Sequence, residues 1–274
     1  FDEPGESLAS IAWEVSDRTD LEAFYPQLES AGFEVKIDYR ALCDRRFIED
    51  LLSFYDAVGN RIELIYGPYV RGDPFVARRA IKGFKKSPYG MNHAELHVSH
   101  PTPLANFYRH KLEFFISDYG LDPVPVYLFH VNGRHNSLAI VRSKKSGFYH
   151  LMVEYQSLDD IKQRHNIAKQ MDDAISYSLD RDTNDYMKSF NAKSPSGFFV
   201  KNGWGGRIIN PTTQKPHETN VGPSFWGNES LYLSEDERNA FRQMHTRSAH
   251  EGKRSLPVVD CVWLYNEFLK KPNE

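Results

Sequence analysis

Cysteine is scarce in this chain. Among its 274 residues there are only two, Cys43 and Cys261, which lie far apart and show no metal-type spacing. Disulfide-stabilised domains and zinc knuckles need clusters of cysteines at fixed spacings. The sequence therefore predicts neither a disulfide framework nor a structural zinc site.

A long hydrophobic run and an excess of positive charge are also missing. The longest apolar stretches, such as residues 124–129, are far shorter than the roughly 20 residues of a membrane-spanning helix. The 34 Lys and Arg residues are outnumbered by 37 Asp and Glu, so no overall basic field attracts nucleic acid or an anionic membrane. The segment Phe1–Pro4 has no secretory-signal pattern. We therefore expect a soluble, cytoplasmic protein without nucleic-acid or membrane partners.

One pattern of strand, helix and further strands occurs three times, within residues 7–70, 91–145 and 148–209. In the first copy, Ile11–Val15 is predicted as a strand and Thr19–Ala31 as a helix, and two strands follow at Leu51–Tyr55 and Arg61–Tyr66. The pattern is a βαβββ unit, and the composition, with 40% hydrophobic and 26% charged residues, is that of a globular protein of about two domains.

A single βαβββ unit exposes one sheet face, whereas two joined units enclose a concave cavity. We expect an N-terminal domain over residues 1–85 that contains one unit, as if its first unit were absent. Residues 86–274 are expected to form a cavity domain from units 91–145 and 148–209. A C-terminal loop and a closing helix over Ser234–Ala249 would complete it, with a Ser-x-x-Glu capping box at Ser234 and Glu237.

Five short motifs occur in a defined order along the chain. They are Glu63–Pro68, Asn132–His135, Tyr149–Met152, Arg181–Asp185 and Gly203–Gly206. Together with the repeats, they resemble the two-domain type I extradiol ring-cleavage dioxygenases of the vicinal oxygen chelate superfamily, in particular the dihydroxybiphenyl-cleaving branch. The resemblance implies an α+β fold in which repeated βαβββ units form half-barrels, and it implies a homo-oligomer.

Members of that family hold Fe(II) with two His and one Glu and leave positions open for a catecholate and O2. The resemblance places the first two ligands on His93 and His150, but the third falls on Lys201. A protonated amine has no lone pair to give to a metal. Three further chemistry positions of the family are also changed, to Asn136, Asp182 and Asn191.

Strand alternation puts His93, Glu95 and His97 on one face, with the apolar residues between them on the other. Because buried charges are usually paired or bound to metal, Glu95 is expected either to pair with Lys201 or to supply the missing carboxylate. Taken alone, His150 is typical of a core histidine, whereas the resemblance places it in the cavity.

Two other polar segments leave alternatives open. His135 and Asn136 either bind a ligand hydroxyl or belong to the turn after Asn132-Gly133. Asp182 is either an ordinary loop residue, or a residue that acts as a general base or anchors a phenol.

Our preferred hypothesis is a dioxygenase-like protein that binds an aromatic or polyphenolic small molecule but has lost its iron site. It would use metal-independent acid/base chemistry of the isomerase, cyclase or lyase type, without a cofactor, and would not be a standard extradiol dioxygenase. The expected catalytic residues are Lys201, Asp182 and His135. The expected substrate-binding residues are His93, Glu95, Asn136, His150 and Asn191.

Two other hypotheses remain. One is a working Fe(II) extradiol dioxygenase, with His93 and His150 as metal ligands and Glu95 as an unorthodox third. The other is a catalytically silent homologue.

Overall fold

The computed structural model describes residues 8–37, 40–73, 76–85, 88–230 and 232–253. Residues 1–4 and Cys261, which were considered above, lie outside these ranges. No helix in the described ranges is both long and apolar enough to cross a membrane.

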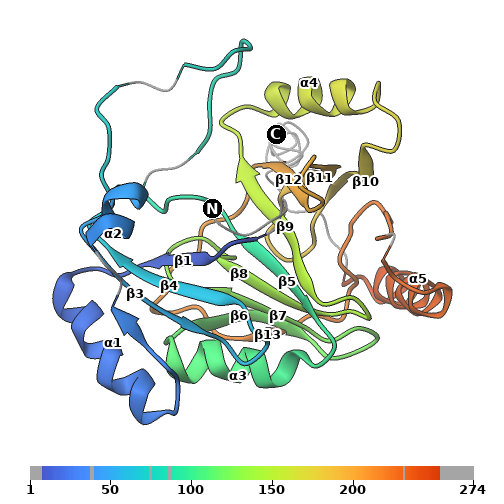
Figure 1. Ribbon diagram of the computed structural model, residues 1–274. Coiled ribbons are helices and arrows are strands. Elements are labelled where there is room, and N and C mark those ends of the chain that lie inside the picture. Colours follow the sequence, from blue (N-terminus) through green and yellow to red (C-terminus); the bar gives the residue numbers. More distant parts are fainter. Residues whose placement is uncertain (1–7, 38–39, 74–75, 86–87, 231, 254–274) are drawn as a thin grey trace, which may run out of the picture.

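The described part of the chain is built from three βαβββ units, one short strand and a C-terminal helix (Figure 1). The first unit consists of β1 (Ile11–Glu14), α1 (Arg18–Ser30), β2 (Lys36–Ile37), α2 (Arg40–Arg46), β3 (Asp50–Tyr55) and β4 (Arg61–Tyr66). The second consists of β5 (Ala94–Val98), α3 (Pro101–Lys111), β6 (Phe115–Gly120), β7 (Val126–His130) and β8 (Leu138–Arg142). The third consists of β9 (Gly147–Glu154), α4 (Leu158–Ala168), β10 (Ile175–Arg181), β11 (Lys188–Lys193) and β12 (Phe199–Trp204). Strand β13 (His217–Glu218) and helix α5 (Glu235–His250) follow.

The three units share one strand order. The sheet of the first unit runs β1-β4-β3-β2, and the other two repeat this order as β5-β8-β7-β6 and β9-β12-β11-β10. In each unit the first and last strands are parallel neighbours. The predicted α+β fold of repeated βαβββ units is therefore confirmed.

The second and third units join edge to edge. Strands β5 and β9 pair antiparallel, which merges the two units into one nine-stranded sheet in the order β10-β11-β12-β9-β5-β8-β7-β6-β13. In Figure 1 these two strands run side by side through the centre of the molecule. The hydrogen-bonded sheet is thus continuous across the boundary between the second and third units.

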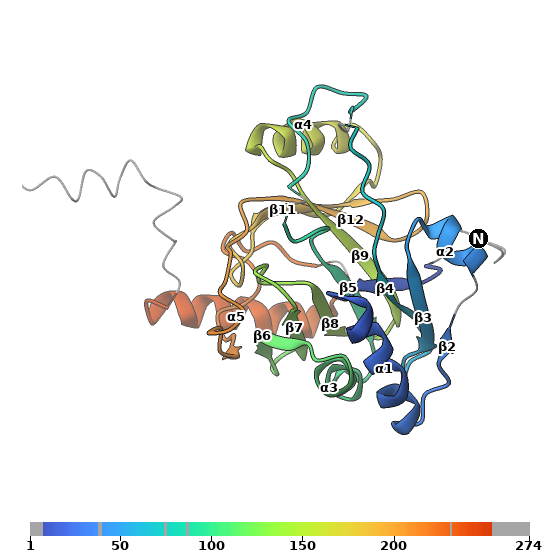
Figure 2. The same cartoon turned by 90° about the vertical axis from the view of Figure 1, so that its left-hand side faces the viewer.

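Helices α1 and α3 lie close together, far from α4 (Figure 2). The largest apolar cluster joins them to both sheets, and Trp13 of β1 packs edge-on against Phe114, with 4.9 Å between ring centroids. This core contains residues from both proposed domains, while a smaller cluster around Cys43, Ile48 and Leu51 lies within residues 1–85 alone. The boundary between residues 85 and 86 stays a prediction.

Side chains at the helix starts explain where the helices begin. Asp17 accepts a hydrogen bond from the Asp20 amide at 2.8 Å, and Ser157 caps α4 in the same way. The capping box predicted at Ser234 and Glu237 is confirmed. The sequence analysis missed α2, β2, β6, β10 and β13, because these segments are either very short or mix Ser, Asp and Arg with apolar residues.

A substitution at Leu104 would test how much the packing of α3 against the sheet contributes to stability. Its side chain has no solvent exposure, and it belongs to the cluster that joins α1, α3 and both sheets. We expect Leu104→Ala to lower the free energy of unfolding by about 2–5 kcal/mol, because it leaves a cavity in a close-packed core. Denaturant unfolding checks this, with Asn106→Ala on the exposed face of the same helix as the control. Equal stability of the two variants would contradict this account of the core.

Candidate functional site

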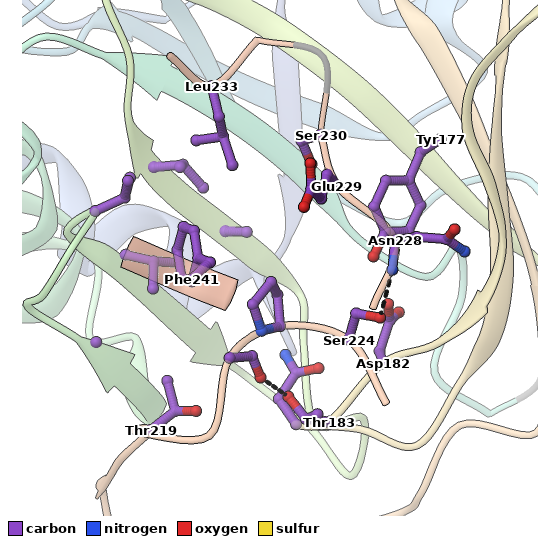
Figure 3. A pocket seen from close by; sticks show the side chains of 18 of the residues that line it. Tyr177, Asp182, Thr183, Thr219, Ser224, Asn228, Glu229, Ser230, Leu233 and Phe241 are labelled. Carbon is purple, nitrogen blue, oxygen red and sulfur yellow. Dashed lines mark hydrogen bonds between the residues drawn. The ribbon is translucent and has the colours of Figure 1, made fainter. Parts of the chain in front are cut away.

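One large pocket lies on the concave face of the nine-stranded sheet, under residues 219–230 and α5. It encloses about 1400 Å³, including space open to solvent. One part of its wall is apolar and includes Val126, Val141, Leu233 and Phe241. Another part is polar and consists of His93, Glu95, Asn136, His150, Tyr177, Asp182, Asn191 and Lys201, among others. In Figure 3, Leu233 and Phe241 lie on one side of the pocket, and Tyr177 and Asp182 lie on the other.

The register of β5 and β9 brings two histidines together in this pocket. Glu95 lies directly opposite His150, and the amide of Met152 donates to the carbonyl of His93 at 2.8 Å. The two imidazole rings meet with their Nε2 atoms 2.9 Å apart. Both rings are buried, and each of the two Nε2 atoms is aimed at the other ring.

Both histidines are held in the neutral form. Burial, and then the positive charge of Lys201, lowers the pKa of His93 well below its usual value. Burial, and then the neighbouring His93, does the same to the pKa of His150. Neutral imidazoles carry the lone pair that a metal ion needs.

An acceptor faces the other ring nitrogen of each histidine. His93 Nδ1 lies 2.9 Å from Asn92 Oδ1, and His150 Nδ1 lies 3.7 Å from Glu95 Oε2. A hydrogen bond at Nδ1 fixes the tautomer in which Nε2 has the free lone pair. Such a bond is present at His93, whereas His150 Nδ1 lies near Glu95 without a hydrogen-bond partner among the described residues.

Lys201 lies in the same pocket, but its partner is Asp182. Lys201 Nζ is 2.7 Å from Asp182 Oδ2, whereas Glu95 contacts His97 at 2.8 Å. The expected pairing of Lys201 with Glu95 is therefore wrong. The sequence could not distinguish the two acids, because Asp182 follows β10, a strand that the sequence analysis did not predict.

Burial and mutual attraction act on this ion pair together. Burial, reinforced by the nearby Asp185, raises the pKa of Asp182 to about 7, although Lys201 opposes the shift. Burial by itself lowers the pKa of Lys201, but the charges of Asp182 and Asp185 outweigh it and raise that pKa. Lys201 is therefore a cation and offers no lone pair.

Of the three ligand positions of the family, two carry side chains that can bind a metal ion, His93 and His150, and the third carries Lys201. Two nitrogen ligands at about 2.1 Å from one metal, in neighbouring positions, are about 3 Å apart, which matches the two Nε2 atoms. Within the described ranges no group of three or more His, Cys, Asp or Glu is placed to hold a metal. Glu95 lies on the Nδ1 side of His150, behind the ring, and not beside the two Nε2 atoms.

The remaining predicted site residues line two different cavities. Asn136 and Asn191 line the large pocket, but His135 does not. Its imidazole lines a small cavity behind the pocket, with Nε2 3.1 Å from Asp118 Oδ2. Asn136 lines both spaces, so it separates His135 from the large pocket.

A β-bulge in β9 brings into the pocket a residue that was not predicted from the sequence. Glu95 pairs with His150 but Leu96 pairs with Phe148, so Tyr149 is an extra residue in β9. As a result, two consecutive side chains, Tyr149 and His150, reach the pocket. Strict alternation of side chains would have put Tyr149 on the other face, and no sequence signal marks the bulge.

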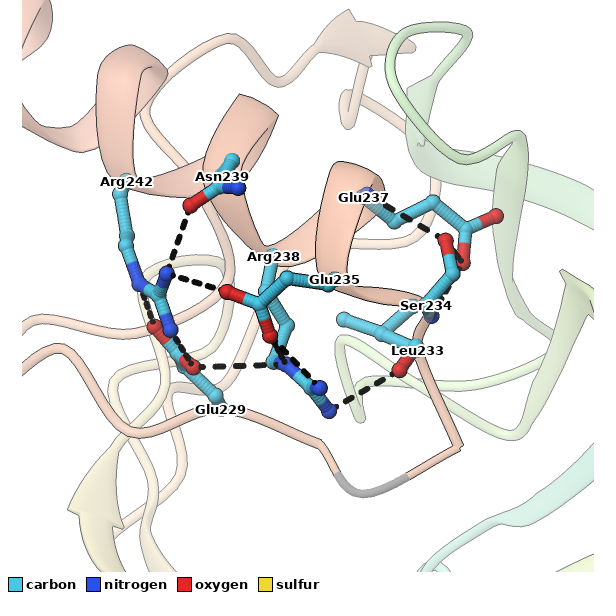
Figure 4. Close-up of polar contacts among 8 residues, drawn as sticks. All are labelled: Glu229, Leu233, Ser234, Glu235, Glu237, Arg238, Asn239 and Arg242. Atoms are coloured by element: carbon cyan, nitrogen blue, oxygen red, sulfur yellow. Dashed lines mark hydrogen bonds and ion pairs between the residues drawn. The ribbon is translucent and has the colours of Figure 1, made fainter.

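Helix α5 forms one wall of the pocket and is anchored by ion pairs (Figure 4). Arg242 binds Glu229 and Glu235, and Arg238 binds Glu235. At the start of the helix, Glu237 accepts a hydrogen bond from Arg142 of β8, which ties α5 to the sheet. These contacts hold the apolar residues of α5 over the pocket.

Comparison with known proteins decides the family. Residues 90–201 match the Glyoxalase/Bleomycin resistance protein/Dioxygenase superfamily. The chain is 34% identical to a biphenyl-2,3-diol 1,2-dioxygenase of Metapseudomonas furukawaii over 235 residues, which cover 82% of this chain and 76% of that protein. The chain belongs to the type I extradiol dioxygenase family.

Two further relatives are a solved structure and an iron-dependent enzyme. The crystal structure of BphC, a halotolerant catechol dioxygenase, is 29% identical and has a TM-score of 0.78, covering 87% of this chain and 80% of that one. An iron-dependent extradiol dioxygenase of Rhodococcus jostii (strain RHA1) is 29% identical, covering 82% of this chain and 80% of that protein.

Three predictions made from the sequence are therefore wrong. Metal-independent acid/base chemistry is overturned by relatives that are ring-cleavage dioxygenases over most of the chain. The expectation that the protein is not a standard extradiol dioxygenase is overturned by the same similarity. The absence of a cofactor is contradicted by the iron-dependent relative. All three predictions gave the exchange at Lys201 more weight than the similarity of the rest of the chain.

Glu237 gives the pocket wall a defined pH dependence. Burial opposes ionisation, but hydrogen bonds from the Ser234 amide and Arg142 lower the pKa of Glu237 from 4.5 to about 2. The folded state thus binds fewer protons here than the unfolded chain, so this stabilisation is present above about pH 5 and is lost as the pH falls toward 2.

We expect Glu237→Gln to lower the free energy of unfolding by about 1 kcal/mol at pH 7, and the difference from wild type to shrink between pH 5 and pH 3. Denaturant unfolding across this range is the measurement. Asp236→Asn, an exposed carboxylate in the same helical turn, is the control. A difference from wild type that does not change with pH would contradict the assignment to the Glu237 charge.

Proposed function

We propose that this protein is an Fe(II)-dependent extradiol dioxygenase that cleaves the ring of an aromatic diol, with the metal held by His93 and His150. One observation carries the proposal: two buried, neutral imidazoles present their Nε2 atoms to each other at 2.9 Å inside the pocket. The relatives named above include enzymes for biphenyl-2,3-diol and for catechol. An aromatic 1,2-diol is accordingly the proposed substrate class.

The proposed iron site departs from the family pattern at one ligand position. The third ligand position carries Lys201 in place of a carboxylate, so the iron would have two protein ligands and more positions open to small molecules. Bound Fe(II) would supply the Lewis acidity and the open coordination positions that bring a diol and O2 together.

Residues of the pocket would bind and orient the diol. Lys201 Nζ, held by Asp182, can donate a hydrogen bond to an ionised diol oxygen and stabilise its negative charge. Asn136 and Asn191 offer amide groups to the same part of the pocket. Tyr149, whose pKa burial raises, remains a neutral hydroxyl.

The apolar wall would accommodate the ring and its substituents. Val126, Val141, Leu233 and Phe241 face the pocket and offer no polar side-chain group. Apolar surface of this kind favours an aromatic ligand and keeps water from it. Assembly as a homo-oligomer and a cytoplasmic location stay predictions.

Iron content and ring cleavage test the proposal together. We expect protein purified without O2 and reconstituted with Fe(II) to bind about one iron per chain and to convert biphenyl-2,3-diol to a yellow ring-cleavage product in air. His150→Ala should lose both, because it removes half of the protein ligands. His100→Ala, an exposed histidine, is the control and should lose neither.

The variant Lys201→Glu examines the departure at the third position. It should bind iron more tightly than wild type, because a carboxylate replaces a cation beside the metal. Wild-type protein without iron, next to a Lys201→Glu variant that binds it, would refute the proposed function and assign the chain to the catalytically silent homologues.

A further inference from the structure

The ion pair of Lys201 and Asp182 lies at the wall of the large pocket. Nζ and Oδ2 are 2.7 Å apart, and both residues line the cavity. The side chain of Lys201 is 15% exposed and that of Asp182 is 9% exposed. Charges so poorly solvated are stable only while each of them keeps a partner. Because open space lies beside the pair, a ligand that enters the pocket can become such a partner.

The two partners differ in how firmly they are held. The amide of Asp182 donates to the carbonyl of Met187 at 2.9 Å, and Asp182 Oδ2 accepts a hydrogen bond from Ser189 at 3.2 Å. Lys201 instead carries its ammonium group on a flexible four-carbon stem. Asp182 therefore stays in place, and the ammonium group can turn toward a ligand without any change in the backbone.

Lys201 remains a cation when Asp182 takes up a proton. Burial by itself lowers the pKa of Lys201, but three carboxylates outweigh it and raise that pKa, and two of these are Asp185 and Glu95. A proton on Asp182 leaves those two charges in place. Burial, reinforced by Asp185 and Asp180, raises the pKa of Asp182 to about 7, although Lys201 opposes the shift. Of the two partners, Asp182 is thus the one that can accept a proton near neutral pH.

Two amide oxygens mark the same end of the pocket as the place of a polar ligand group. The side-chain oxygens of Asn136 and Asn191 are buried in residues that line the pocket, and neither has a hydrogen-bond partner among the described residues. Asn191 is the cross-strand neighbour of Lys201 in the β11–β12 ladder. A buried polar atom without a partner is costly, so this end of the pocket favours a ligand that carries a polar group.

A phenol fits this arrangement better than other acids do. Its hydroxyl is weakly acidic, so it can give its proton to Asp182 and present the resulting anion to Lys201. A carboxylic acid is ionised before it arrives, and its charge would meet that of Asp182 with no proton to neutralise either. The ring of the phenol finds apolar residues across the pocket, where Leu233 and Phe241 lie on the side away from Asp182 (Figure 3).

We propose that Lys201 and Asp182 form a binding site for phenols that takes the hydroxyl as its anion without a metal. The O–H bond of the ligand breaks, its proton goes to Asp182 Oδ2, and its electron pair stays on the phenolate oxygen. Lys201 Nζ exchanges its hydrogen bond to Asp182 for one to that oxygen. No other bond changes, and no oxidant is needed. The inference goes beyond the proposed function, because it requires neither iron nor a second hydroxyl.

A phenol that turns yellow when it ionises tests this site directly. We expect chelator-treated, metal-free protein to bind 3-nitrophenol and to turn it yellow at a pH where the free compound is mostly neutral. Lys201→Met should weaken this binding about 10–100-fold, because it removes a hydrogen bond to a charged oxygen. Lys162→Met, which breaks an exposed Lys–Asp pair on α4, is the matched control and should bind the probe like wild type.

The fate of the proton tests the role of Asp182. Above about pH 7, where Asp182 is ionised in the free protein, the proton moves within the complex, so wild type should release none to the solution. Asp182→Asn has no proton acceptor and should release one proton for each phenolate that it binds. A pH indicator in weakly buffered solution measures the difference. Equal proton release by the two proteins would overturn the transfer to Asp182.

The other outcomes separate this inference from the proposed function. A yellow complex that forms only after Fe(II) is added would overturn the metal-free site and support the iron enzyme. A yellow complex in a protein that binds no iron would support the inference and refute the proposed function. Equal binding of benzoate, an aromatic anion without a hydroxyl, would show a simple anion site and overturn the inference.

A second variant covers the case in which Lys201→Met does not fold, which circular dichroism would reveal. Lys201→Gln keeps a polar side chain but removes the charge, and it should lose the yellow complex to the same extent. Binding equal to that of wild type in either folded variant would contradict the role of Lys201.

Discussion

The antiparallel pairing of β5 with β9 is the constraint on which the site depends. It joins two βαβββ units into one sheet, and its register sets His93, Glu95 and His150 around a single point of the pocket. The bulge in the same ladder adds Tyr149. No single unit carries these groups, because His93 and His150 are 57 residues apart in the sequence. The pocket chemistry is therefore a property of the joint between the two repeats.

Charge is distributed unusually around the two histidines. Lys201 occupies the position where the family resemblance leads us to expect a metal-binding carboxylate. Two acidic residues, Asp182 and Glu95, lie in the same pocket. Asp182 neutralises Lys201 from the end of β10, and Glu95 stands behind His150 on β5. Because each acid has a separate partner, the exchange at Lys201 does not leave a lone buried cation in the pocket.

The sequence predicted the fold better than it predicted the site. Repeated hydrophobic patterns and caps located most helices and strands, since these depend on local periodicity. Strand β10 was not predicted, because Ser and Asp interrupt its apolar residues. The partner of Lys201 could not be predicted for the same reason: Asp182 reaches it only through the position of that strand. The place of Glu95 behind His150 needed the register between two strands that are remote in sequence.

The central strand pair also determines when the site can appear as the chain folds. A contact between strands so far apart closes a long loop, and its entropic cost must be met before the contact stabilises anything. Either half can form its own sheet earlier, from neighbouring strands, but it then carries only one of the two histidines. The close approach of His93 and His150 is consequently a late product of folding.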